Sequence, residues 1–178
     1  MTTTITEGTI HVFTYKEGML ARLAHDLRLS VTKWTMLIDG RDVRGTFDPK
    51  SLVVDGVVKG HRIDPKVLSR KDLAEITDNI DQHVLKTSRH PEITYEGRVT
   101  RAKDGTFTVK GRLTLVGRSG PLELTLKRAG DRLTGQATLL QTRWGITPFR
   151  AALGAIKIKN DVGVKVEFPV PNVDVEEL

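Results

Sequence analysis

The chain has 178 residues, of which 38% are hydrophobic and 28% charged, and its formal net charge is +6. This composition is typical of a soluble globular protein, and we expect residues 1–178 to form a single domain. The absence of cysteine excludes disulfides, thiolate metal sites and cysteine nucleophiles. We see neither a secretory leader nor an apolar run that could span a membrane, so we expect a cytoplasmic protein.

The first third of the chain reads as short strands with one brief helix. Apolar and polar residues alternate in three runs, at residues 9–16, 27–31 and 43–47, and residues 34–38 either extend the second run or begin another strand. Residues 19–24 contain good helix formers and predict one or two helical turns. Asp55 and Gly56 lie between two short apolar runs and predict a tight turn.

Residues 70–85 predict one amphipathic helix, the only long helix of the chain. Its apolar residues recur at helical spacing, at Leu73, Ile76, Ile80 and Val84. The segment from Ser69 to Asp72 resembles a capping box at the start of the helix. A helix with such an apolar stripe must cover something apolar, so we expect it over an end or flank of a sheet.

Residues 91–140 form the longest patterned stretch, with four alternating runs separated by turns at 103–105, 118–121 and 130–131. Such short links favour antiparallel pairing of neighbouring strands, and two final strands linked at Asn160 and Asp161 follow. We therefore expect an all-β fold with one helix: an antiparallel up-and-down β-barrel of about eight strands. Alternation places one set of its side chains inside, namely Ile93, Tyr95, Val99, Phe107, Val109, Leu113 and Leu115.

Four glycines fall on the apolar side of their strands, at Gly45, Gly97, Gly111 and Gly135. A glycine inside a strand marks a bend or a close approach of two chain segments. These glycines let the strands coil at the corners of the barrel, leave room inside it for a ligand, or do both, since the two roles are compatible.

Several segments, in this order, resemble the YceI-like family. They include Pro91-Glu92-Ile93-Thr94-Tyr95, the V-x-G-x-L-T-L-x-G pattern over residues 109–117, and Arg143-Trp144-Gly145-Ile146. Residues 116–119 depart modestly from the usual histidine-glycine segment of that family. The resemblance implies a lipocalin-like barrel that binds polyisoprenoid or similar amphiphilic lipids, with no cofactor other than such a bound lipid.

Twelve apolar residues are expected to contact a lipid tail: Phe47, Ile93, Tyr95, Val99, Phe107, Val109, Leu113, Leu115, Leu124, Leu133, Leu139 and Trp144. His25, Asp26 and Arg143 are candidates for contact with a lipid headgroup, because a histidine beside a carboxylate can be held in one tautomer and bond a polar ligand. A satisfied histidine at a helix-to-strand junction remains the alternative.

Other binding and catalytic sites find little support. The five histidines show no metal-ligand spacing, and no catalytic or phosphate-binding motif is present, so we expect no metal site and no catalytic residue. Residues 89–132 hold ten Lys or Arg and five Asp or Glu, a net charge of +5. This surface is either an ordinary solvated one or one that transiently touches an anionic membrane. Nucleic acid is not an expected partner. The sequence leaves open whether the chain forms a homodimer.

The leading hypothesis is a non-enzymatic protein that binds or carries an isoprenoid, an isoprenoid quinone or a fatty-acyl lipid. An enzyme acting on an amphiphilic substrate, with His25, Asp26 or Arg143 as acid–base groups, is the second hypothesis. The third is a barrel with a filled core that serves as a stress-related interaction module.

Overall fold

A computed structural model describes residues 2–18 and 24–171. One antiparallel sheet of thirteen strands dominates it. The strands are β1 (Thr2–Ile5), β2 (Thr9–Lys16), β3 (Leu27–Val31), β4 (Trp34–Asp39), β5 (Asp42–Phe47), β6 (Leu52–Lys59), β7 (Arg62–Asp64), β8 (Ile93–Arg101), β9 (Phe107–Leu115), β10 (Arg118–Ala129), β11 (Arg132–Leu140), β12 (Arg150–Ala151) and β13 (Ile156–Pro169). Five of the six residues of the helical turn expected at 19–24, residues 19–23, lie outside the described residues.

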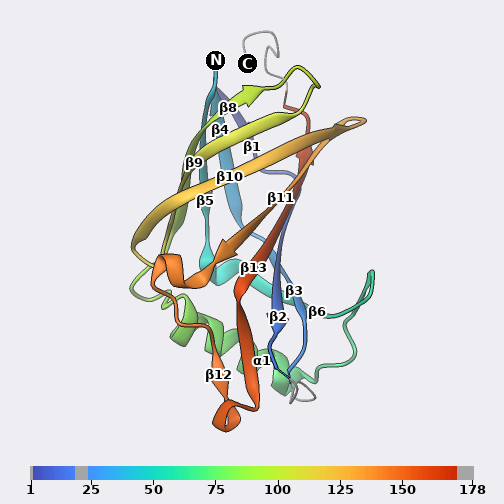
Figure 1. Cartoon of the computed structure of the whole chain (residues 1–178), viewed down its shortest axis with the longest axis vertical. Coiled ribbons are helices and arrows are strands. Elements are labelled where there is room, and N and C mark those ends of the chain that lie inside the picture. The colour runs from blue at the N-terminus through green and yellow to red at the C-terminus, as the bar shows by residue number, and fades with distance from the viewer. Residues whose placement is uncertain (1, 19–23, 172–178) are drawn as a thin grey trace.

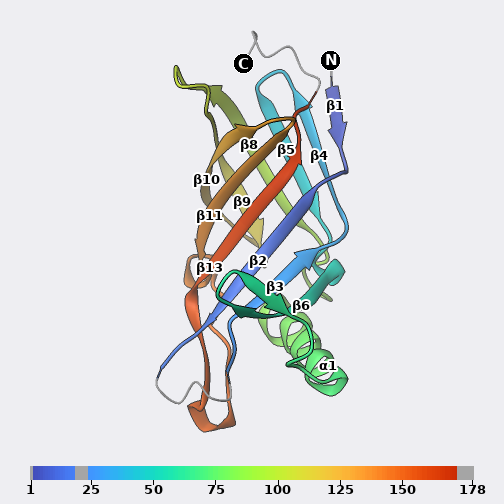
Figure 2. The ribbon, with the colours of Figure 1, turned by 90° about the vertical axis from the view of Figure 1, so that its right-hand side faces the viewer.

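The sheet curls around a long axis, with helix α1 (Arg70–Asn79) across one end (Figures 1 and 2). Its strand order is β1-β4-β5-β8-β9-β10-β11-β13-β2-β3-β6-β7, with β12 paired to β13. The expected antiparallel sheet with one helix is confirmed. Among the described residues the order ends at β1 and β7, so closure into a barrel of about eight strands stays a prediction.

The register of the meander β8–β11 follows the alternation in the sequence. Tyr95 pairs with Leu113 and Val99 with Val109, and all four are buried. Lys110 and Arg112 are exposed on the opposite face. A one-residue slip would expose the whole apolar set, which is why the pattern specifies the register so strongly.

The turn expected at residues 118–121 is wrong, because these residues pair with β9 as the first part of β10. Val116 and Gly117 make the hairpin turn instead, with φ angles of 50° and 72°. A two-residue hairpin loop of type I′ has positive φ at both positions, and its twist then matches that of the flanking strands. Valine rarely adopts that conformation, so the sequence pattern favoured the glycine and proline that follow.

Two further corrections concern strand continuity. Asp55 and Gly56 form no turn; β6 runs through them with a bulge, where Arg28 pairs with Gly56. The carboxylate of the bulged Asp55 accepts a 2.8 Å hydrogen bond from Nε of Arg28. Likewise, Asn160 and Asp161 do not separate two strands, because β13 continues through them with a register irregularity.

The predicted helix lies where the apolar spacing placed it. Ser69 Oγ accepts a 3.1 Å hydrogen bond from the amide of Asp72, and the Asp72 carboxylate accepts a 2.8 Å bond from the amide of Ser69, so the capping box is confirmed. After α1 the chain continues as a π-helical turn, η2 (Ile80–Val84). Together, α1 and η2 form the one long helical segment of the described part of the chain. Two of its apolar residues, Ile80 and Val84, pack against the core of the sheet.

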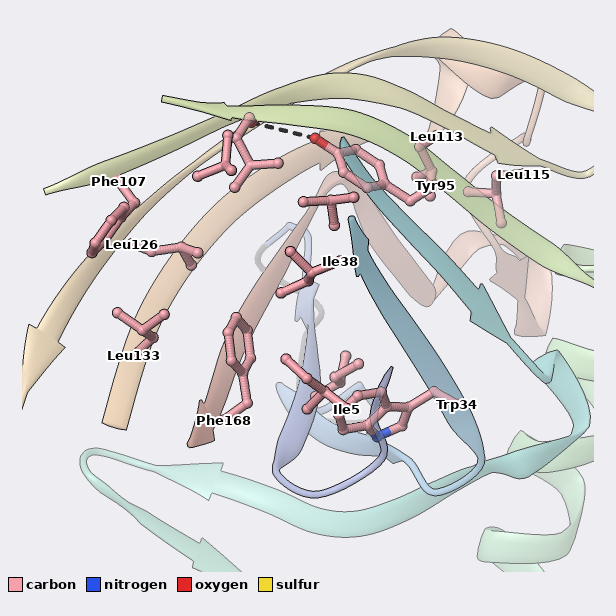
Figure 3. Close-up of a cluster of buried hydrophobic side chains, with 14 of the residues drawn as sticks. Ile5, Trp34, Ile38, Tyr95, Phe107, Leu113, Leu115, Leu126, Leu133 and Phe168 are labelled. Atoms are coloured by element: carbon pink, nitrogen blue, oxygen red, sulfur yellow. Dashed lines mark hydrogen bonds between the residues drawn. The ribbon is translucent and has the colours of Figure 1, made fainter. Parts of the chain in front are cut away.

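Buried side chains fill the end of the sheet that lies away from the helix. Figure 3 shows Phe107, Leu126 and Leu133 together there, with Phe168 nearby. Three 3-10 turns complete the described structure: η1 (Pro49–Ser51), η3 (Gln141–Trp144) and η4 (Ala152–Gly154).

Candidate binding cavity

An interior cavity of about 250 Å³ lies inside the curled sheet, bordered by the π-helical turn on one side and by Leu126 and Phe168 toward the far end. Most of its walls come from inward-facing apolar residues of the meander, β2 and β13, while the π-helical turn closes one side with Ile80 and Val84. Nine of the twelve residues expected to contact a lipid tail line it: Phe47, Ile93, Tyr95, Val109, Leu113, Leu115, Leu124, Leu139 and Trp144.

The other three expected residues, Val99, Phe107 and Leu133, are buried but do not line the cavity. Val99 and Phe107 flank the turn between β8 and β9, and Leu133 follows the turn between β10 and β11. Both turns lie at the end of the sheet away from the helix (Figures 1 and 2), and buried side chains fill the interior there. Alternation predicts which face a residue occupies but not its height along the axis.

Sequence reasoning missed the wall formed by the two ends of the chain. Strand β2 contributes Ile10, Val12 and Thr14 to the lining, and β13 contributes Val162, Val164, Val166 and Phe168. Both strands alternate clearly in the sequence, so the signal for an inward face was present. Their antiparallel pairing joins residues about 150 positions apart, as Val166 with Ile10, and no local pattern reveals it.

Three polar side chains of the cavity wall are engaged by backbone carbonyls, and Thr14 adds one hydroxyl to the lining. Trp144 Nε1 donates to the carbonyl of Leu113 at 2.9 Å, and Gln141 Nε2 donates to that of Lys159 at 2.8 Å. The hydroxyl of Tyr95 donates to the carbonyl of Leu122 at 3.0 Å. Because these groups are already satisfied, the wall presents mainly hydrocarbon to whatever enters.

Burial raises the pKa of Tyr95 to about 12, and the charge of Glu123 adds to the shift. The phenol therefore stays neutral at ordinary pH and remains a hydrogen-bond donor. It acts as part of the wall, with no proton to exchange near neutral pH.

The glycines do not leave the room that the ligand alternative required. A Cβ on Gly111 would lie 2.2 Å from the carbonyl oxygen of Glu96 and 2.6 Å from Cζ of Tyr95. A Cβ on Gly97 would lie 2.9 Å from the hydroxyl of Tyr95. These two glycines therefore make space for the tyrosine ring, and a Cβ on Gly135 would similarly meet Leu126 at 2.4 Å.

Two surface grooves share wall residues with the cavity. The first, of about 230 Å³, lies between β6 and the helix; Leu29, Leu52 and Ile80 line both it and the cavity. Its charged residues are Lys50, Asp78 and Asp81. The second, of about 450 Å³, lies between the π-helical turn and residues 147–150 and shares Val84 with the cavity. His83 and Arg150 lie on its rim.

None of the three candidate headgroup residues lines the cavity or either groove. The Asp26 carboxylate accepts a 2.8 Å hydrogen bond from the backbone amide of Lys16. His25 is half-buried, and Arg143 is exposed. The structure thus brings His25 and Asp26 to the start of β3 and leaves Arg143 apart from them on η3.

Within residues 2–18 and 24–171, no cluster of three His, Asp or Glu side chains is arranged to hold a metal ion. No helix in the same ranges has the length and apolar character needed to cross a membrane.

Several solved structures share this fold at low sequence identity. A crystal structure of Burkholderia cenocepacia BcnA aligns with a TM-score of 0.59 and 12% identity, over 92% of this chain and 96% of that one. A polyisoprenoid binding domain from Saccharophagus degradans, implicated in plant cell wall breakdown, aligns with a TM-score of 0.59 and 12% identity, over 93% and 95%. A Campylobacter jejuni YceI protein aligns with a TM-score of 0.54 and 11% identity, over 82% and 85%.

Curated proteins provide no match to this sequence. Residues 21–170, most of the chain, match the YceI-like domain. This chain belongs to the YceI-like domain family.

Proposed function

We propose that this protein binds the apolar chain of an amphiphilic lipid inside its cavity, without transforming it chemically. The observation that carries the proposal is the hydrocarbon-lined cavity of about 250 Å³. A dry apolar cavity of roughly 150 Å³ is large enough to bind benzene. The interior here therefore has room for a bulkier apolar group, such as a segment of an isoprenoid or acyl chain.

The energetics favour a long chain over a small molecule. Each methylene group that leaves water contributes about 0.8 kcal/mol, so ten contribute about 8 kcal/mol. Binding must offset several kcal/mol of lost translational and conformational freedom. A short apolar molecule would barely offset that cost, whereas a chain of ten or more carbons would bind with useful affinity.

The lipid class rests on the family. An isoprenoid, an isoprenoid quinone or a fatty-acyl lipid fits a wall that is mainly hydrocarbon, and one structural neighbour is a polyisoprenoid binding domain. Because Tyr95, Gln141 and Trp144 are already bonded to carbonyls, we place the polar headgroup outside the cavity. The two grooves that share wall residues with the cavity are the places where it would emerge.

Binding without catalysis is the better supported alternative. An enzyme would need acid–base groups at the ligand, and the residues considered for that role, His25, Asp26 and Arg143, lie outside the cavity wall. Membership of the YceI-like family also favours a binding protein. A fully filled core, the third hypothesis, is disfavoured by the cavity itself.

The test is ligand retention and uptake by the full chain. Native mass spectrometry of protein purified without detergent should show a population carrying an added lipid mass. After organic extraction of that lipid, a fluorescent fatty-acyl or isoprenoid probe should bind saturably, with one site per chain. A protein that carries no lipid and takes up neither probe would overturn the proposal.

A further inference from the structure

The hairpin formed by β12 and the start of β13 projects beyond the sheet, at the same end of the molecule as α1 (Figures 1 and 2). At its tip the side chain of Leu153 is fully exposed, with a relative accessibility of 110%. The neighbours of Leu153 at the tip, Ala152 and Gly154, are exposed too. Single exposed leucines are ordinary, but this one stands at the extreme tip of a hairpin.

The backbone of the tip holds the leucine outward at a cost. Ala152 and Leu153 have φ angles of 50° and 55°, in the left-handed region that residues with a Cβ adopt rarely. Such conformations are disfavoured, and they persist where the surrounding structure or a function requires them. Glycine would relieve the strain at either position, yet the sequence places alanine and leucine there.

The stem of the hairpin concentrates positive charge. Arg150 pairs directly with Lys157 across the two strands, and Lys159 follows two residues later. Like charges opposite each other in an antiparallel pair repel. Among the described residues no ion pair joins any of these three cations to an acidic side chain, and residues 150–160 include no Asp or Glu. Glu17, which directly follows β2, donates its backbone amide to the carbonyl of Lys157, and no ion pair joins its carboxylate to the described cations of the stem.

The cations of the meander, unlike those of this hairpin, include some that lie close to carboxylates. Its outward cations Lys110 and Arg98 lie 3.6 Å and 3.2 Å from the carboxylates of Glu123 and Asp42. The basic surface of residues 89–132 is thus partly neutralised, whereas the cations of the hairpin stem have no such partner among residues 2–18 and 24–171.

We propose that the β12–β13 hairpin docks this protein onto anionic lipid membranes, with Leu153 inserting among the acyl chains while Arg150, Lys157 and Lys159 contact the headgroups. An apolar tip above a basic stem is the arrangement that binds the interface of an anionic bilayer. Anionic headgroups would also relieve the repulsion between Arg150 and Lys157.

A membrane fits this surface better than a protein partner does. Stable protein interfaces bury upwards of about 1,000 Å² of total surface with matched packing. One leucine and its small neighbours on a narrow tip offer far less. A bilayer needs no matching shape, and a few inserted apolar atoms with several cations suffice for reversible binding.

Docking would also orient the cavity, and this step rests on the proposed function. Arg150 at the base of the hairpin lies on the rim of the groove that shares Val84 with the cavity. A docked hairpin would hold this groove near the headgroups. An amphiphile could then pass between bilayer and cavity over a short path.

The experiment measures partition of the full-length protein onto phosphatidylcholine vesicles with and without phosphatidylglycerol. Wild type should bind the anionic vesicles, and about 0.5 M salt should weaken that binding because it screens exposed charges. Leu153→Gly should lower the partition coefficient about tenfold or more, since a leucine contributes that much when it leaves water. Because glycine tolerates the local φ, this variant should fold at least as well as wild type.

Charge variants separate the hairpin from the rest of the surface. Lys157→Gln should lower partition about fivefold, as expected for one basic residue near an anionic surface. Lys127 is exposed on β10, away from the hairpin. Lys127→Gln removes the same charge there and should have no effect of that size.

Three outcomes would overturn the proposal. Wild type could fail to bind anionic vesicles, or Leu153→Gly could bind them as tightly as wild type does. The third is that Lys127→Gln weakens binding as much as Lys157→Gln does. Self-association lost in Leu153→Gly, without vesicle binding, would assign the tip to a second copy instead. Probe uptake by Leu153→Gly should match wild type, so a failure of docking and a failure of lipid binding are distinguishable.

Discussion

The side chain of Tyr95 on β8 crosses over the neighbouring strand β9 and donates a 3.0 Å hydrogen bond to the carbonyl of Leu122 on β10. Gly97, Gly111 and Leu122 stand side by side in the register of these three strands. Because the two glycines carry no side chains, the ring of Tyr95 lies directly over their backbone. One tyrosine thus links β8 to β10 across β9 and forms part of the cavity wall. Figure 3 shows its ring on the inner face of the sheet.

Tyr95→Phe tests the hydrogen bond while keeping the ring. The variant should lose about 1 kcal/mol of the free energy of unfolding at pH 7, the usual contribution of one such bond. Chemical denaturation followed by circular dichroism measures the loss. A variant as stable as wild type would mean that the hydroxyl contributes nothing beyond the ring.

The raised pKa of Tyr95 predicts a specific alkaline loss of stability. Its pKa moves from 10.0 to about 12 on folding, so the folded state favours the neutral phenol. The resulting stabilisation is present below pH 10 and is lost as pH rises through the folded pKa of about 12. Over that range the free energy of unfolding should fall more in wild type than in Tyr95→Phe. Parallel falls in the two proteins would contradict the assignment.

Gly111→Ala should be severely destabilising, by about 3 kcal/mol, the upper end of the cost of overpacking. The new methyl would collide with the backbone oxygen of Glu96, which cannot move without breaking the sheet. Gly45→Ala is the matched control, because its nearest neighbour is Cζ of Phe47 at 2.7 Å, the far end of a side chain that can swing away. Thermal unfolding of the two variants should therefore differ clearly. Equal losses would mean that Tyr95 and β8 adjust more easily than the close contacts imply.

The sequence was informative where structure depends on near neighbours. The strands of the meander, their inward faces and the capping box at Ser69 all follow from local alternation or spacing. The turn at Val116 escaped notice because a valine with positive φ violates the preferences on which turn prediction rests. The bulge at Asp55 escaped because a bulge and a turn use the same residues, aspartate and glycine.

The candidate site was predictable only in part, for a geometric reason. Which residues face inward follows from period-two alternation, but the height of each along the axis depends on the stagger of all the strands. Three residues that were predicted to face inward are therefore buried but lie beyond the cavity: Val99, Phe107 and Leu133. The role of Gly111 was hidden for the same reason, since it appears only when Tyr95 reaches across a strand that pairs in register with its own.

Narrowing the cavity should remove lipid binding and leave the fold intact. Leu124 on β10 lines the cavity and is only half-buried against the core. Tryptophan in its place would put extra ring volume into space that a lipid chain would otherwise occupy. Filling existing space avoids the cost of about 1–3 kcal/mol that overpacking a tight core brings. Leu124→Trp should thus bind a fluorescent fatty-acyl or isoprenoid probe at least about tenfold more weakly, with the free energy of unfolding changed by less than about 1 kcal/mol.

The adjacent residue supplies the control. Thr125 is exposed on the outer face of the same strand, so Thr125→Trp adds an identical side chain that cannot reach the cavity. Probe titration of the two variants beside wild type separates loss of space from a general effect of tryptophan on β10. If Leu124→Trp bound the probe as wild type does, the ligand would not occupy this cavity. If it unfolded easily and wild type took up no probe, the interior would be behaving as a filled core, and the lipid-binding proposal would fail with it.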